Sequence, residues 1–253
     1  MKTKIFLPDN FYSRLFLKEI KPDKEFDVSF LPSPIISKRL NEDQNAIGLI
    51  PSVDLLTFKE LYVSSRTGIS FNALLSNSYL YFKENENSVD ELSIAGDVTS
   101  NEIVLSKILF RELYNIDIKT RLITQDFLPN EDTSLIVGDK NFLEENFFNG
   151  LSFSEEIIEL INAPYVNFLL AGRSDQALKN FVTRYEANLL DGHNNSFSEL
   201  QSGFSELAND FIRINLQHVI FDFEDQDLEG IKYLLQLPFF YGIINEMIDV
   251  KFV

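Results

Sequence analysis

The stretch from Ala46 to Asp54, which reads Ala-Ile-Gly-Leu-Ile-Pro-Ser-Val-Asp, constrains the fold of this chain more than any other feature. It joins a continuous apolar run directly to a polar turn at Pro51 and Ser52, which is typical of the carboxyl end of a central strand. In open α/β sheets, ligands bind at the carboxyl ends of the strands. A ligand site at Ser52 and a plain turn after a strand are both consistent with these residues.

The first part of the chain alternates strand-like and helix-like runs. This alternation predicts βαβαβ winding and a mostly parallel sheet. Two more strands are expected on either side of a turn at residues 65–68. The expected strands are 4–7, 26–31, 46–50, 61–64 and 71–76, and the expected helices are 11–20 and 34–41.

A second unit begins after the polar stretch at residues 83–90 and repeats the logic of the first. An expected strand at 92–97 is followed by an amphipathic helix at 100–114. Thr99 and Glu102 have the spacing of a capping box, which satisfies backbone N–H groups at the start of a helix. A capped helix start is also a general anion site, so Thr99 and Ser100 are candidates for ligand contacts. Further strands are expected at 118–124 and 134–137.

The chain as a whole is expected to form a two-lobed α/β protein. The helical stretch at 181–211 is followed by an expected strand at 217–221 and an expected helix at 225–241, and this C-terminal portion can return to the first lobe. We therefore expect a discontinuous first lobe formed by residues 1–85 and 190–253, with an inserted second lobe at 86–189. The ligand cleft is expected between the lobes.

Charge and composition exclude several classes of function. The 253 residues carry a formal net charge of −17, which argues against binding to nucleic acid or to an anionic membrane surface. The chain has no cysteine, and His193 and His218 lie in different regions without the spacing of metal ligands, so no metal site is expected. The apolar run at the start of the chain is too short for a signal peptide, which predicts a cytoplasmic protein. We expect a monomer or a homodimer.

Several short motifs, taken in order, resemble one known family over nearly the whole chain. They are the turn at 46–54, Ser65-Arg66 with Leu74-Leu75-Ser76, Asp97 with Ser100, Leu135-Ile136-Val137-Gly138-Asp139, Ala163-Pro164-Tyr165-Val166, and Asp227-Leu228-Glu229-Gly230-Ile231 followed by Tyr241-Gly242-Ile243. The chain resembles the chorismate dehydratases of the futalosine route to menaquinone, which have the type 2 periplasmic-binding-protein fold.

The resemblance implies a cofactor-independent lyase that removes water from chorismate to give 3-enolpyruvylbenzoate. Chorismate, or a related carboxylate, is then the small-molecule partner, held by groups that bind its carboxylates and served by a group that takes the ring proton. The implied binding residues are Arg14, Ser52, Arg66, Phe71, Thr99, Ser100 and Asp139, and the candidates for proton handling are Tyr12, Ser70 and Asn72.

The chain departs from the family pattern at three polar positions that would face the ligand. Tyr12 aligns with a functional asparagine, Phe71 aligns with the reactive serine, and Glu102-Ile103 replaces a Thr-Ser pair. Phe71 can neither accept a proton nor donate to a carboxylate. One alternative is therefore a paralogue that keeps the two-lobe clamp but binds a small molecule without turnover. Another is an interaction protein that uses its many phenylalanines, although such residues usually form the core.

Overall fold

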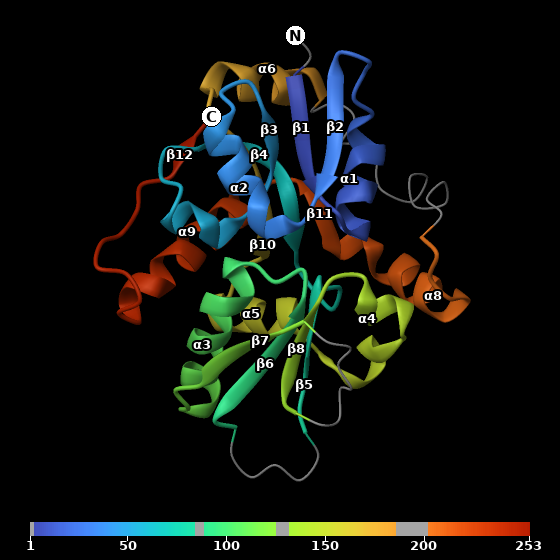
Figure 1. Cartoon of the computed structure of the whole chain (residues 1–253), viewed down its shortest axis with the longest axis vertical. Helices are drawn as coiled ribbons and strands as arrows, with labels where there is room; N and C mark the ends of the chain where they lie inside the picture. The colour runs from blue at the N-terminus through green and yellow to red at the C-terminus, as the bar shows by residue number, and fades with distance from the viewer. Residues whose placement is uncertain (1–2, 84–88, 125–131, 186–201) are drawn as a thin grey trace.

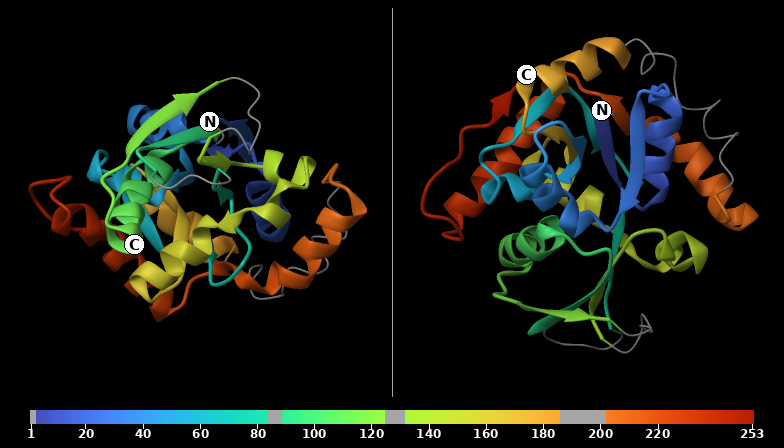
Figure 2. Two further views of the ribbon diagram at one scale, coloured as in Figure 1. Left: turned by 90° about the horizontal axis from the view of Figure 1, so that it is seen from below. Right: turned by 45° about the horizontal axis from the view of Figure 1, so that its top comes forward.

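The computed structural model describes residues 3–83, 89–124, 132–185 and 202–253, and it has two α/β lobes (Figure 1). Each lobe is built on its own sheet, with seven strands in the first and five in the second. The further views in Figure 2 agree with this division. Among the described residues, no helix combines the length and the apolar character that crossing a membrane requires.

The sheet of the first lobe has the strand order β11-β4-β10-β3-β1-β2, and β12 also pairs with β4. β2 and β3 both run parallel to β1, as the βαβαβ alternation predicts. β10 runs antiparallel between β3 and β4, so a late part of the chain fills the middle of this sheet. The strands are β1 (Thr3–Pro8), β2 (Phe26–Leu31), β3 (Ile47–Pro51), β4 (Tyr62–Phe71), β10 (Tyr165–Gly172), β11 (Val219–Asp222) and β12 (Lys251–Phe252).

The sheet of the second lobe has the strand order β7-β6-β8-β5-β9. β6 pairs in parallel with both β7 and β8, so the carboxyl ends of β6 and β8 lie side by side. The turns that follow these two strands contact the first lobe, as described below. The strands are β5 (Ser78–Tyr81), β6 (Glu91–Gly96), β7 (Lys119–Ile123), β8 (Ser134–Val137) and β9 (Leu151–Ser152).

Helices cover both sheets, and α1 and α2 of the first lobe and α3 of the second begin at the junction between the lobes. α1 and the helix at Ser100–Tyr114 have the bounds expected from the sequence. The α-helices are α1 (Phe11–Ile20), α2 (Ser33–Glu42), α3 (Ser100–Tyr114), α4 (Lys140–Leu143), α5 (Phe153–Ile161), α6 (Asp175–Tyr185), α8 (Glu206–Asn215) and α9 (Asp225–Phe240). Short 3₁₀ helices are η1 (Ser52–Leu56), η2 (Asn146–Asn149) and η4 (Leu216–His218).

The chain passes between the two sheets at places other than those expected. The expected boundaries at 85/86 and 189/190 lie outside the described residues. β5 belongs to the second sheet because it pairs with β8, and β10 belongs to the first because it pairs with β3 and β4. The expectation placed each of these strands in the other lobe.

One continuous strand, β4, occupies much of the region where two strands and a turn were expected. Gly68 lies within this strand, where a Cβ would come within 2.3 Å of the carbonyl oxygen of Phe168 on β10. The glycine therefore permits the close approach of two backbones and does not mark a turn.

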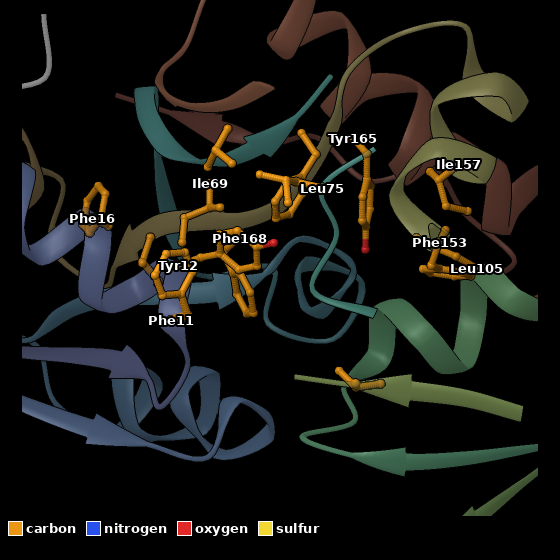
Figure 3. Packing of buried hydrophobic residues seen from close by; sticks show 14 of the residues in the cluster. Phe11, Tyr12, Phe16, Ile69, Leu75, Leu105, Phe153, Ile157, Tyr165 and Phe168 are labelled. Atoms are coloured by element: carbon orange, nitrogen blue, oxygen red, sulfur yellow. The ribbon is translucent and has the colours of Figure 1, made fainter. Parts of the chain in front are cut away.

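Buried aromatic rings pack where the lobes meet (Figure 3). Tyr12 on α1 and Phe71 on β4 are 1% and 0% exposed, and their ring centroids lie 4.9 Å apart in an edge-on arrangement. Phe153 and Tyr165 form a second edge-on pair, with centroids 6.4 Å apart. Burial of such large rings is a major source of stability, so Phe71 is a core residue.

Candidate functional site at the junction of the lobes

Asp97 of the second lobe contacts the start of α2 in the first lobe. It follows β6, and its carboxylate accepts the backbone N–H of Ser33 at 2.9 and 3.1 Å and also accepts the Ser33 hydroxyl. Ser33 is the first residue of α2, which has no side-chain cap of its own. The free N–H groups at a helix start carry partial positive charge, so they favour a carboxylate. Asp97 therefore caps a helix that belongs to the opposite lobe.

Asp139 makes the corresponding contact at α1. It follows β8, and its Oδ1 accepts the backbone N–H of Phe11, the first residue of α1, at 2.9 Å. The N-cap of the same helix, Asn10, accepts the N–H of Ser13 at 2.9 Å. The first turn of α1 is thus satisfied by one side chain of its own lobe and one of the other lobe.

Each of these aspartates follows a glycine in a left-handed backbone conformation. Gly96 and Gly138 both have a φ of +97°, a conformation that L-residues rarely adopt. Because β6 and β8 are neighbouring parallel strands, the two Gly-Asp turns leave the sheet side by side. They direct Asp97 and Asp139 toward the first lobe.

A third carboxylate, Asp54 in η1, also lies at the junction. It accepts the hydroxyl of Ser37 on α2 at 2.5 Å and that of Ser100 on α3 at 2.6 Å. Here the first lobe supplies the carboxylate and Ser100 of the second lobe donates to it, whereas Asp97 and Asp139 are carboxylates of the second lobe.

The buried amide of Asn101 completes the polar contacts. Its Oδ1 accepts the backbone N–H of Val53 at 2.9 Å, and its Nδ2 donates to the carbonyl oxygen of Asn167 at 2.8 Å. Val53 lies in η1 and Asn167 in β10, both in the first lobe, whereas Asn101 lies in α3. The start of α3 is therefore fixed against the first lobe by two successive residues.

Burial dominates the electrostatics of the junction. It raises the pKa of Asp54 and Asp97, although serine hydroxyls bonded to each oppose the shift. It raises the pKa of Asp139 to about 6, although the Phe11 N–H and the charge of Arg14 oppose the shift. Carboxyl groups with raised pKa values hold their proton to a higher pH than exposed ones.

The three candidates for proton handling are not brought together. Tyr12 donates its hydroxyl to a backbone carbonyl at 3.1 Å, and burial raises its pKa well above the usual range. Ser70 is fully buried, and burial raises the pKa of the nearby Asp227 carboxyl although the Ser70 hydroxyl opposes the rise. Asn72 is exposed, with its Oδ1 2.8 Å from Nδ1 of His218. Each side chain has different neighbours, so they form no common site.

The candidates for carboxylate binding are also separated. Arg66 lies on β4, 3.5 Å from Asp222, and lines an outer cavity of about 700 Å³ to which the second lobe contributes no residue. Ser52 is fully buried and donates its hydroxyl to the carbonyl oxygen of Val166 at 2.5 Å. The Ser52 hydroxyl at the end of β3 therefore binds β10 and is not available to a ligand. Phe71 is a core residue and is not available either.

Tyr12 and Phe71 are buried where the lobes meet, and Arg14, Thr99, Ser100 and Asp139 place charged or polar groups at the same junction. Arg14 is half exposed, pairs with Asp9 and lies 4.4 Å from the centre of the Phe30 ring. Thr99 forms the expected capping box, since its backbone N–H and its hydroxyl donate to the carboxylate of Glu102 at 2.9 and 2.6 Å. Glu102 is buried within its own helix start, so it does not face a ligand.

Asp97, Ser33 and Asp54 lie at the junction but were not among the predicted site residues. A signal for Asp97 was present, because the pair Gly-Asp follows an apolar strand at both 96–97 and 138–139. Ser33 carries no such signal, since its partner is 64 residues away in sequence.

Comparisons with solved structures place the chain in a class by its fold. It superposes on the aliphatic sulphonate binding protein SsuA of Escherichia coli with a TM-score of 0.64 and 10% identity, over 99% of this chain and 90% of that one. It superposes on the Candida albicans CA3427 gene product, described as having the generic periplasmic-binding-protein fold, with a TM-score of 0.60 and 9% identity, over 97% and 92%. Protein AF1704 of Archaeoglobus fulgidus gives a TM-score of 0.58 and 12% identity, over 96% and 98%.

The chain therefore has the two-lobed periplasmic-binding-protein fold, as the sequence led us to expect. No protein-family model matches it, and no curated protein matches it in sequence. Identities of 9–12% show a shared fold and do not identify a ligand.

Proposed function

We propose that this protein binds a small uncharged or cationic molecule between its lobes and does not convert chorismate. The observation that carries this proposal is the separation of Tyr12, Ser70 and Asn72, because Tyr12 donates to a backbone carbonyl, Asn72 contacts His218 and the hydroxyl of Ser70 is buried near Asp227. General acid-base chemistry needs its groups within hydrogen-bonding reach of one substrate atom. The two-lobed frame is present, but the described residues do not bring a set of acid-base groups together in this way.

The charges at the junction support the ligand class. Asp54, Asp97 and Asp139 lie there, and Arg14 is the cation that acts on Asp139. Two like charges 4 Å apart repel by about 4 kcal/mol at the effective dielectric near a protein surface, and opposite charges attract by a similar amount. A dicarboxylate such as chorismate would meet this repulsion, whereas an amine would gain from the same groups.

Chorismate dehydratase activity is the second candidate. The order of motifs from Ala46 to Ile243 favours it, since the resemblance covers nearly the whole chain. In that case Arg14 would bind a substrate carboxylate, because it is the expected arginine that lies at the junction. The predictions of a cytoplasmic location and of a monomer or homodimer apply to either candidate.

One experiment separates the two candidates. Purified protein is incubated with chorismate, and 3-enolpyruvylbenzoate is sought by mass spectrometry, while thermal shift is recorded with chorismate and with a set of amines and neutral compounds. We expect no product and a shift with an amine or neutral compound. Product that is lost in Arg14→Ala and kept in Arg66→Ala would establish the lyase instead, since Arg66 lies away from the junction.

A further inference from the structure

The second lobe supplies a carboxylate to both of the first-lobe helices that begin at the junction. α1 and α2 each have ten residues, and their first N–H groups are bound by Asp139 and Asp97 respectively. A helix start with free N–H groups is a general anion site. The starts of α1 and α2 are therefore occupied by carboxylates of the second lobe.

We propose that Asp97 and Asp139 form an intramolecular latch that occupies these two anion positions, holds the lobes closed without a ligand and excludes free anions. The proposal deepens the proposed function and rests on it, because the latch lies between the same two lobes. It adds that a ligand reaches the junction only after the two carboxylates have left the helix starts.

Local geometry shows that the latch is built in and is more than incidental packing. α2 has no side-chain cap within its own lobe, so the hydrogen bonds that Ser33 donates to Asp97 take the place of one. Gly96 and Gly138 adopt the same left-handed conformation immediately before the two aspartates. Each carboxylate is thus positioned by the glycine turn that follows its own strand.

The first test measures closure without any ligand. The Asp97→Ala/Asp139→Ala variant is compared with wild type by small-angle X-ray scattering. The Asp97→Asn/Asp139→Asn variant keeps an oxygen that accepts the helix N–H groups. Asp117→Ala is the matched control, because Asp117 is an exposed aspartate of the second lobe that pairs with Arg111 at 3.6 Å.

At about pH 5, we expect wild type, the asparagine variant and the control to share one radius of gyration, near the value of about 18 Å for a compact chain of this length. The alanine variant should have a larger radius with unchanged circular dichroism. An alanine variant as compact as wild type would overturn the latch. If the double alanine variant does not fold, the two single alanine variants are measured, and each should show part of the increase.

The second test uses inorganic sulfate as the probe for the vacated helix starts. By isothermal titration calorimetry, the double alanine variant should bind sulfate at least about tenfold more tightly than wild type, since two helix starts become free. The double asparagine variant should resemble wild type. Equal sulfate affinity in wild type and the alanine variant would overturn anion exclusion.

The latch and the proposed function can fail separately. Scattering without ligand reports closure whether or not any compound binds, so chorismate turnover would overturn the proposed function and leave the scattering result to decide the latch. The opposite outcome has two parts. Stabilisation of the protein by an amine would support the binding role. A radius of gyration that the alanine substitutions leave unchanged would overturn the latch.

Discussion

Gly96 and Gly138 occupy equivalent positions but differ in what surrounds them. Both have a φ of +97°, which is costly for any residue with a side chain. A Cβ at Gly96 would also lie 2.0 Å from the carbonyl oxygen of Val137, whereas the nearest atom to a Cβ at Gly138 is 4.0 Å away. Gly96 therefore has a steric role in addition to its conformational one.

We expect Gly96→Ala to be more destabilising than Gly138→Ala. Gly138→Ala should cost only the conformational term of about 1–2 kcal/mol, whereas Gly96→Ala must also displace the backbone of β8. Urea unfolding of both variants gives the two free energies of unfolding. Equal losses would show that the contact with Val137 is relieved without cost.

At the scale of elements, the capping box of α3 contains a buried acid. Burial raises the pKa of Glu102, and the bonds from Thr99 only partly offset this shift. In the unfolded chain the same group titrates near its ordinary value of about 4.3. The stabilisation that this difference contributes is full below the unfolded pKa and is lost as the pH rises through the folded pKa.

Glu102→Gln should remove this pH dependence. Glutamine keeps an oxygen for the backbone N–H of Thr99 and carries no charge, so the stability of the variant relative to wild type should rise between about pH 4 and about pH 8. Urea unfolding across this range gives the measurement. Glu112→Gln, an exposed position on the same helix, is the control and should follow wild type.

Elements with a clear local pattern were predictable from the sequence. The helices Phe11–Ile20 and Ser100–Tyr114 have the expected bounds because their starts and apolar periods are local signals. The turn expected at residues 65–68 is instead part of β4, where the pairing with β10 shifts register and Gly68 contacts a strand about 100 residues later. The site was less predictable for the same reason, because a local pattern cannot show that Asp97 meets Ser33 across the junction.

At the scale of the whole molecule, closure moves carboxylates from water into a buried junction. In the closed protein, burial is the main cause that raises the pKa of Asp139 to about 6. The N–H of Phe11 and the charge of Arg14 oppose this rise, whereas the charges of Asp9 and Asp97 add to it. When the lobes open, the group returns to water and to an ordinary value of about 3.9. The closed state therefore binds a proton more strongly than the open state.

Acidification should accordingly favour closure, and a rise in pH through about 6 should weaken it. We expect the radius of gyration of wild type to increase between about pH 5 and about pH 8. Asp139→Asn should remain compact over this range, because its amide oxygen still accepts the N–H of Phe11 without a charge to desolvate. A radius that is independent of pH in wild type, or an equal increase in the asparagine variant, would show that Asp139 does not couple protonation to closure.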